Sequence, residues 1–228
     1  MAINKKQIGL LTCLGIILSL FFFMGCLYRT SEIPHTTAFP LKSGKIVVFG
    51  FKPAVSEGEQ PRVVRSPFTG TVFYGEPVSN EIADKMTSEI FTRLLGNKDL
   101  DLVDPGEVKG VYASILSSSQ DINDKEMLRK IGTAFSADAL LIGHIYRWQD
   151  RVGGDYSVNR PASVAFDLYL LRPEDSFILW KGKYDKTQRS LSENILDMGL
   201  FLKGKGRWLT AGDLALLGLD EMLGSPKP

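Results

Sequence analysis

The pattern of apolar and polar positions along the chain changes period several times, which predicts a succession of strands and helices. A β-branched and aromatic run at Lys45–Phe51 is typical of a short buried strand. Apolar residues then recur every four positions over 82–94, which predicts a helix that begins after Ser79 and ends near Gly96. The short apolar run Leu100–Val103 predicts a second strand.

Two more helices are predicted in the middle of the chain. Asp104-Pro105-Gly106-Glu107 has the pattern of a capping box with proline at the first helical position, where its missing N–H costs nothing. The apolar stripe of this helix consists of Val108, Val111, Tyr112, Ile115 and Leu116. A third helix is predicted around Asp124–Phe135.

Extended runs follow at 138–150, 161–171 and 177–186, and their turn-rich connections indicate an antiparallel meander. The middle run alternates, with Ser163, Asp167 and Tyr169 on one face and apolar residues on the other. The first run places His144 on the face shared by Leu140, Ile142, Tyr146 and Trp148.

Two helices are predicted to close the chain. Ser190 with Glu193 and Thr210 with Asp213 form capping boxes, and Gly224 ends the last helix. The whole order predicts a mixed α/β fold: a sheet of about five strands that includes the three-stranded antiparallel meander, with helices packed on it. We expect a single α/β domain over residues 45–228, and a long loop over 52–77 that folds into a hairpin at 68–70.

The N-terminal segment has the order of an export signal. Lys5 and Lys6 precede an uncharged run from Ile8 to Met24, which ends at Gly25-Cys26. This end resembles a bacterial lipobox, in which cleavage falls before the cysteine and the cysteine is acylated. The resemblance implies a signal peptide over 1–25, cleavage between Gly25 and Cys26, and lipidation of Cys26. An uncleaved transmembrane helix over 8–28 is the alternative, because a span needs about 20 residues.

The residue after the cysteine indicates in which membrane the lipid anchor lies. Leu27 is not the aspartate that retains lipoproteins in the inner membrane, so the resemblance implies an outer-membrane anchor that faces the periplasm, with inner-membrane anchoring as the alternative. Residues 26–44 are polar and proline-containing, and we expect a tether there.

Charge and composition reduce the range of functions that the chain could have. The 27 basic and 26 acidic residues almost cancel, so the chain lacks the basic excess of nucleic-acid-binding proteins. Cys13 lies in the signal segment and Cys26 is consumed by lipid, so the expected mature domain has no thiol for a disulfide, a metal site or catalysis. We expect no cofactor, no metal and no small-molecule substrate.

Three motifs resemble a known group of envelope domains. They are Ala137–Gly143 (ADALLIG), Phe166–Leu171 (FDLYLL) and Ile178–Gly182 (ILWKG). This pattern resembles curli-secretion-channel lipoproteins, lipoprotein activators of penicillin-binding proteins, and the N-terminal domain of the Tol-system protein TolB. The resemblance implies their α/β fold. A curli-type pore also needs long spanning hairpins, and 52–77 is broken by Pro61 and Pro67.

Candidate chemistry is sparse. His144 has no second histidine or cysteine to join it, which favours a structural histidine over a ligand or a base. Two segments are candidate partner surfaces: the loop 61–74 and the cationic, aromatic segment 201–208. Their expected contact residues are Phe68, Phe73, Tyr74, Lys203, Lys205, Arg207 and Trp208.

These observations predict a non-enzymatic envelope lipoprotein that acts through protein–protein interaction or self-association, in envelope assembly, secretion or cell-wall regulation. Two alternatives stay open. One is a subunit of an oligomeric outer-membrane export channel, which requires an amphipathic hairpin within residues 52–77. The other is an envelope glycan hydrolase that uses two carboxylates.

Overall fold

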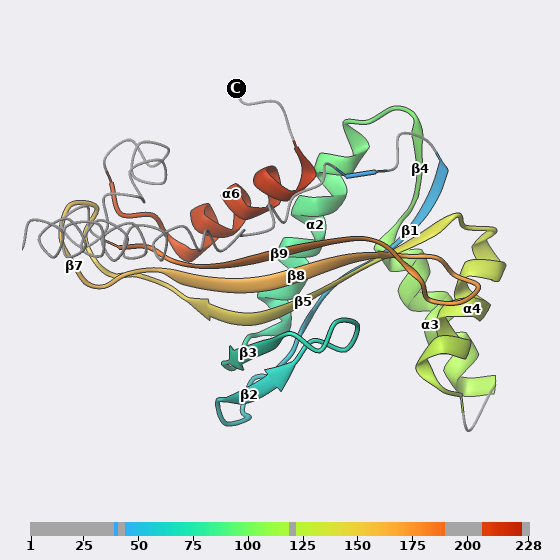
Figure 1. Cartoon of the computed structure of the whole chain (residues 1–228), viewed down its shortest axis with the longest axis horizontal. Coiled ribbons are helices and arrows are strands. Elements are labelled where there is room, and N and C mark those ends of the chain that lie inside the picture. Colours follow the sequence, from blue (N-terminus) through green and yellow to red (C-terminus); the bar gives the residue numbers. More distant parts are fainter. Residues whose placement is uncertain (1–38, 41–43, 119–121, 190–206, 225–228) are drawn as a thin grey trace, which may run out of the picture. The chain divides into compact units, whose positions relative to one another are not determined.

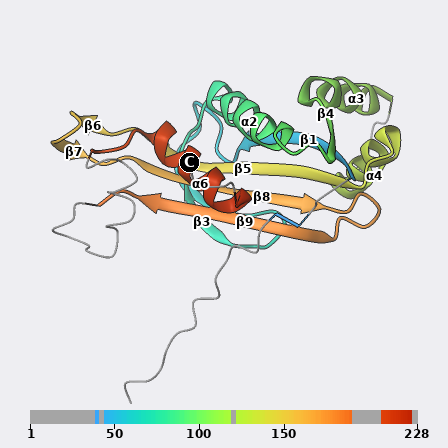
Figure 2. The ribbon, with the colours of Figure 1, turned by 90° about the horizontal axis from the view of Figure 1, so that it is seen from above.

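The structure, a computed structural model, describes residues 39–40, 44–118, 122–189 and 207–224. Its centre is a five-stranded sheet with the strand order β4-β1-β5-β8-β9 (Figures 1 and 2). The strands are β1 (Gly44–Pro53), β4 (Leu100–Val103), β5 (Ala139–Gln149), β8 (Ser163–Leu171) and β9 (Ile178–Thr187).

The sheet is mixed. Strand β1 is parallel to both β4 and β5, whereas β5, β8 and β9 pair as an antiparallel meander. The parallel part is made by strands that are separated by helices, as crossover connections require. The predicted α/β fold class, with its five strands and three-stranded meander, is confirmed.

Within the described ranges, four helices pack against this sheet. They are α2 (Asn80–Leu95), α3 (Pro105–Ser118), α4 (Asp124–Phe135) and α6 (Ala211–Leu223). Their first turns are capped by side chains: Ser79 accepts from the Ile82 N–H, and Asn123 accepts from the Glu126 N–H. Thr210 and Asp213 form the predicted reciprocal capping box.

The two faces of the sheet carry different elements. Helices α2 and α6 cover one face, while α3, α4 and a hairpin of β2 (Arg62–Arg65) and β3 (Val72–Gly75) lie on the other (Figure 1). The hairpin occupies the region predicted to fold around residues 68–70. We call the face under the hairpin the hairpin face.

The α2/α6 face holds the larger core, because the alternation along β8 sends Val164, Phe166 and Leu168 to that side. Met86 and Ile90 of α2 and several leucines of α6 pack on them. Strand β8 is nevertheless buried at every position, including its polar residues, since the hairpin face is covered as well.

Two bulges change which face a residue occupies. The register of β1 shifts between Val48 and Gly50, and that of β5 shifts between Ile145 and Arg147. An extra residue in a strand reverses the alternation beyond it. Trp148 therefore packs in the α2/α6 core, and its predicted place on the face of His144 is wrong.

Two smaller features complete the fold. Strands β6 (Val152–Gly153) and β7 (Val158–Arg160) form a short hairpin between β5 and β8. The helix predicted from Ser190 and Glu193 lies outside the described residues. Among the described helices, none combines the length and the apolar character that a membrane span requires.

Candidate functional site

The hairpin face carries a buried carboxylate. Asp167 lies in the middle of β8 and is 1% exposed. Its Oδ2 accepts hydrogen bonds from the hydroxyls of Tyr146, at 2.7 Å, and Tyr169, at 2.9 Å. A charge without partners at this depth would cost several kcal/mol, so these donors are what makes the site stable.

His144 is the third partner of this carboxylate. It pairs with Asp167 in the β5–β8 register, and its Nδ1 lies 3.1 Å from Asp167 Oδ1. A carboxylate that already accepts from two hydroxyls favours a proton on that Nδ1, which leaves Nε2 as the nitrogen available to other groups. The arrangement fixes both the ring orientation and the tautomer of His144.

The same network holds the hairpin on the sheet. The Tyr169 hydroxyl, which donates to Asp167, lies 2.7 Å from Ser66 Oγ and 3.0 Å from Thr69 Oγ1, and so accepts from these hydroxyls. The ring of Phe73 stacks on Tyr146 with centroids 3.8 Å apart and planes 5° apart. The hairpin is thus bound by both polar and aromatic contacts.

This environment raises the pKa of both tyrosines. Burial raises the pKa of Tyr146, and the neighbouring Asp167 charge raises it further. Burial likewise raises the pKa of Tyr169 to about 12, although its hydrogen bonds to Ser66 and Thr69 act in the opposite direction. Both hydroxyls therefore remain protonated donors at neutral pH.

A pocket of about 940 Å³ lies on the same face. Its lining comes from β1, α3, the start of α4, the loop between β2 and β3, β5 and the turn between β8 and β9. His144 is the member of the Asp167 network that lines it. The network therefore presents one oriented imidazole to the pocket while its carboxylate stays buried.

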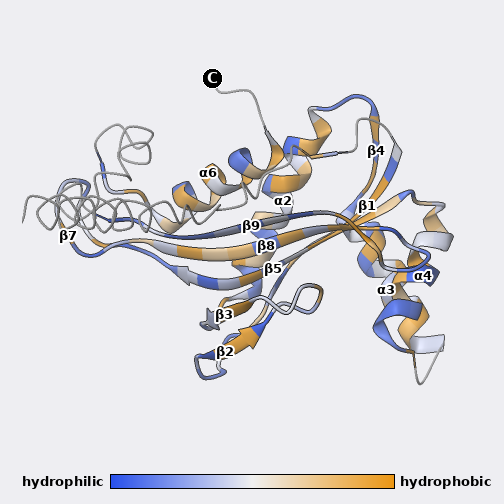
Figure 3. Ribbon diagram, viewed as in Figure 1, coloured by the Kyte–Doolittle hydropathy of each residue, from blue (hydrophilic) through white to orange (hydrophobic). Residues whose placement is uncertain are grey.

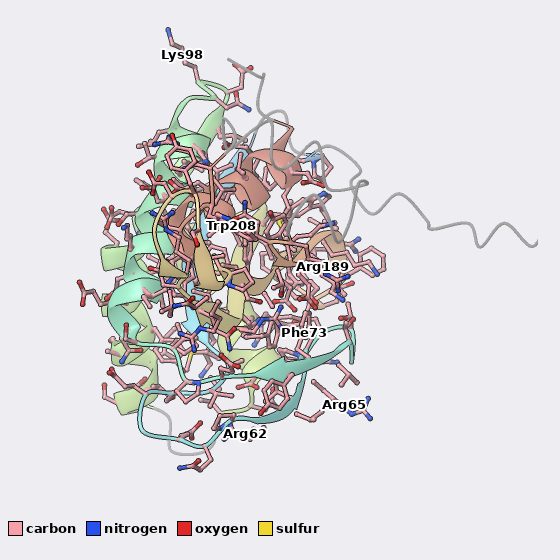
Figure 4. The ribbon with its side chains drawn as sticks, turned by 90° about the vertical axis from the view of Figure 1, so that its left-hand side faces the viewer. Arg62, Arg65, Phe73, Lys98, Arg189 and Trp208 are labelled. Carbon is pink, nitrogen blue, oxygen red and sulfur yellow. The ribbon has the colours of Figure 1, made fainter. Side chains whose placement is uncertain are left out.

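The outward side of the hairpin is apolar and exposed. Val63 and Tyr74 are cross-strand partners, and Val72 pairs with Arg65. Val63 is 66% exposed, Val72 51% and Tyr74 56%. Figure 3 shows the apolar character of β2 and β3, and Figure 4 shows Arg62 and Arg65 pointing away from the sheet while Phe73 points toward it.

The predicted partner-surface residues therefore have different environments. Tyr74 is exposed and Phe68 is partly buried, with its ring centroid 4.9 Å from that of Tyr169. Phe73 is 3% exposed, so its ring contributes to the attachment of the hairpin and is not free for a partner. This burial removes Phe73 from the expected contact surface.

The second predicted surface is only partly described. Arg207 is exposed and lies 3.7 Å from Asp155, while the Trp208 N–H donates to the Asp155 carbonyl and its own carbonyl accepts from Arg151. These contacts join the segment to the β6–β7 hairpin. Lys203 and Lys205 lie outside the described residues, as do Gly25, Cys26 and Leu27.

The interpretation of the sequence missed Asp167, Tyr146 and Tyr169 as a site. The signal was present, since an aspartate stands between Phe166 and Leu168 in a strand that is otherwise almost wholly apolar. Its partner could be found only from the register that places it opposite His144. Among the described residues, no group of three or more His, Cys, Asp or Glu is arranged to hold a metal ion.

The fold and the site define a mixed α/β domain with a hairpin fixed over a buried His–Asp–Tyr network. No protein-family model and no curated protein matches this chain in sequence.

Solved structures similar to the chain include the LpoB C-terminal domain from Salmonella enterica, with 16% identity over 66% of this chain and 88% of that chain and a TM-score of 0.40. Another is lipoprotein GNA1162 from Neisseria meningitidis, with 13% identity over 69% of this chain and 90% of that chain and a TM-score of 0.39. The PelC dodecamer from Paraburkholderia phytofirmans is 12% identical over 82% of this chain and 90% of that chain, with a TM-score of 0.39. At such scores these likenesses carry no argument about function. The resemblance to curli-channel lipoproteins and to TolB stays a prediction.

Proposed function

We propose that this chain is a non-enzymatic, lipid-anchored protein of the bacterial envelope whose α/β domain binds another envelope protein through the outer side of the β2–β3 hairpin. In this proposal Cys26 carries the anchor in the outer membrane and the domain faces the periplasm. The observation that carries it is the exposed apolar surface made by Val63, Val72 and Tyr74.

This surface has the chemistry of a protein interface. Tyrosine and arginine are enriched in binding hot spots, and here Tyr74 and Arg65 flank two exposed valines. An apolar cross-strand pair in water gains free energy when a partner covers it. Single exposed apolar residues are ordinary, but a contiguous group on one side of a hairpin is typical of an interaction surface.

The hairpin is also fixed before a partner arrives. Phe73 and Ser66 hold its inner side against Tyr146 and Tyr169, so the outer side keeps one geometry. A surface that is already ordered loses little conformational entropy on binding, and this favours recognition by the hairpin. The role of the buried network in this proposal is structural.

The two alternatives gain no support from this geometry. Strands β2 and β3 have 4 residues each, whereas a membrane-spanning strand needs about 9 to 11, so the hairpin is too short for the export-channel alternative. For the glycan hydrolase, the carboxylate at the centre of the site is enclosed by three donors and is 1% exposed. Within the described part of the chain, no other observation favours hydrolysis.

Site-specific photocrosslinking in cells tests the proposal. A benzoylphenylalanine at position 63 or 72 should give a UV-dependent adduct of one defined mass with an envelope protein. The same group at position 95 is the control, because Leu95 is also exposed but lies on α2, across the sheet.

A substitution completes the test. Tyr74→Asp should abolish the adduct formed from position 72 and leave the unfolding midpoint unchanged, since Tyr74 is exposed. Equal adducts from positions 63, 72 and 95, or an adduct that survives Tyr74→Asp, would contradict the proposal.

A further inference from the structure

The pocket on the hairpin face has the size of a small-molecule site. Its volume of about 940 Å³ lies in the range of about 300 to 1,000 Å³ that is common for ligand pockets. It is bounded by elements that all lie on one side of the sheet, namely α3, α4 and the loop of the β2–β3 hairpin (Figure 1). The pocket is a different surface from the outer side of the hairpin, so a ligand bound there does not depend on the partner proposed above.

The walls of the pocket are about equally apolar and polar. The apolar part includes Phe49, Phe68, Tyr112, Leu116, Leu128 and Ile178. Val111 and Ile115 of α3 pack against the core, whereas Tyr112 and Leu116 line the pocket, and Leu116 is 46% exposed. Apolar area that the fold leaves uncovered favours a ligand with a hydrocarbon part.

The charges of the pocket favour an anion. Lys52 and Lys125 line it, and among the described residues neither forms an ion pair; Lys52 Nζ lies 5.2 Å from the centroid of the Tyr112 ring. The two acidic groups are already compensated. Asp175 lies 3.3 Å from Arg172 and accepts from the Phe177 N–H, and Asp124 lies in the first turn of α4, where the helix dipole favours a negative charge.

Two polar groups in the lining lack a complete set of partners. Nδ1 of His144 is taken by Asp167, which leaves Nε2 for another group. Ser176 Oγ is buried and has no hydrogen-bond partner among the described residues. Ser176 also has φ of 59°, a left-handed backbone that is unusual for serine. The Ser176 Oγ is enclosed, so it lies beneath the pocket surface and is not placed to contact a ligand.

We propose that this pocket binds a single-chain anionic amphiphile. The hydrocarbon chain packs against Phe68, Tyr112 and Leu116, and the potential of Lys52 and Lys125 selects a carboxylate or phosphate headgroup. His144 Nε2, which is an acceptor when Nδ1 carries the proton, is available to a hydroxyl of the ligand such as that of a phosphate monoanion. Carboxylate and phosphate headgroups share this chemistry, so the test has an arm for each.

The protein purified from membranes as the cell produces it and placed in phosphatidylcholine nanodiscs is the sample, and a diazirine-bearing fatty acid is the probe. Irradiation followed by peptide mapping should place the label on segments that line the pocket, above all the α3 peptide with Tyr112 and Leu116. Dodecanoate and dodecyl phosphate should compete with the label. Dodecanol and dodecyltrimethylammonium, which have the same chain without the negative charge, should compete at least about tenfold less well.

Paired variants separate the site from general partition into the bilayer. Lys52→Gln combined with Lys125→Gln should weaken the competition by dodecanoate about tenfold. Lys98→Gln is the control, because Lys98 is exposed after the end of α2, is labelled in Figure 4, and does not line the pocket. Leu116→Gln should reduce labelling, whereas Leu95→Gln, at an exposed leucine on the other side of the sheet, should not.

The results have clear consequences. Label confined to the pocket peptides, blocked by the anionic competitors and lost in the double lysine variant, supports the proposal. Label spread over the surface, equal competition by the alcohol or the cation, or equal behaviour of the double variant and Lys98→Gln, overturns it.

Discussion

His144 and Asp167 face each other across β5 and β8, with 3.1 Å between the histidine Nδ1 and the aspartate Oδ1. The aspartate is buried and binds two tyrosine hydroxyls as well, and one of these holds the hairpin loop through Ser66 and Thr69. One carboxylate thus joins the central sheet to the element that we propose as the partner surface. Its removal should affect both stability and hairpin attachment.

Asp167→Asn should lower the free energy of unfolding by about 2 to 3 kcal/mol, because the amide offers one acceptor oxygen to three donors and brings an N–H₂ group into the same space. Urea unfolding followed by circular dichroism measures this. Asp101→Asn is the control, since Asp101 is exposed and its ion-pair partner among the described residues is Lys45, at the surface. Equal losses in both variants would show that the network has no special role.

Alkaline pH should destabilise the protein through Tyr169. Its pKa is raised from 10.0 to about 12 by burial, so the folded state holds the phenol proton more tightly than the unfolded chain. Its contribution to stability is therefore complete below pH 10 and is lost as the pH rises from about 10 to about 12. Tyr146, whose pKa burial also raises, acts in the same direction.

The measurement is the free energy of unfolding from pH 8 to pH 12. Tyr169→Phe should be less stable at pH 8, because it loses the bonds to Asp167 and Ser66, and its stability should fall less steeply above pH 10. Tyr74→Phe, at an exposed tyrosine, should follow the wild-type curve. Parallel curves for all three proteins would contradict this assignment.

Thr87→Val should cost about 1 to 3 kcal/mol although it conserves shape. The bulge at Gly50, with φ of 76°, turns the Phe51 N–H toward α2, where Thr87 Oγ1 accepts it at 2.8 Å. Valine leaves that buried N–H without a partner. Thr133→Val is the matched control in urea unfolding, because Thr133 is exposed and its hydroxyl donates to the Arg129 carbonyl of its own helix. A loss as large in the control would assign the effect to helix propensity.

Ser136→Gly should stabilise the protein by about 1 kcal/mol. Ser136 ends α4 with φ of 51° and ψ of 46°, a left-handed conformation that glycine adopts without strain. Thermal unfolding should show a higher midpoint. Ser114→Gly, in the exposed middle of α3, should instead lower it.

Cys26→Ser should leave the precursor uncleaved and without lipid. Labelling of cells with an alkyne fatty acid, together with the gel mobility of the protein, measures both steps. Cys13→Ser should mature normally, because Cys13 lies inside the apolar run and not at its end. Normal maturation of Cys26→Ser would refute the lipobox and favour the transmembrane alternative.

Much of the fold could be predicted because its signals are local. Capping side chains at Ser79 and Thr210 and the glycine after α6 lie within a few residues of the helix ends that they define. The period of the apolar residues separated strands from helices in the same way. The candidate site could not be found by these means, because Asp167 meets His144 only after two strands have paired.

The order of the five sheet strands and of the described helices, the mixed α/β class and the expectation of a lipid anchor at Cys26 could be predicted because each depends on neighbouring residues. The strand order, the burial of Asp167 and Phe73 and the place of Trp148 emerged from the folded chain alone. They depend on strand register, because a bulge of one residue exchanges the faces of a strand and long-range packing selects where the bulge falls.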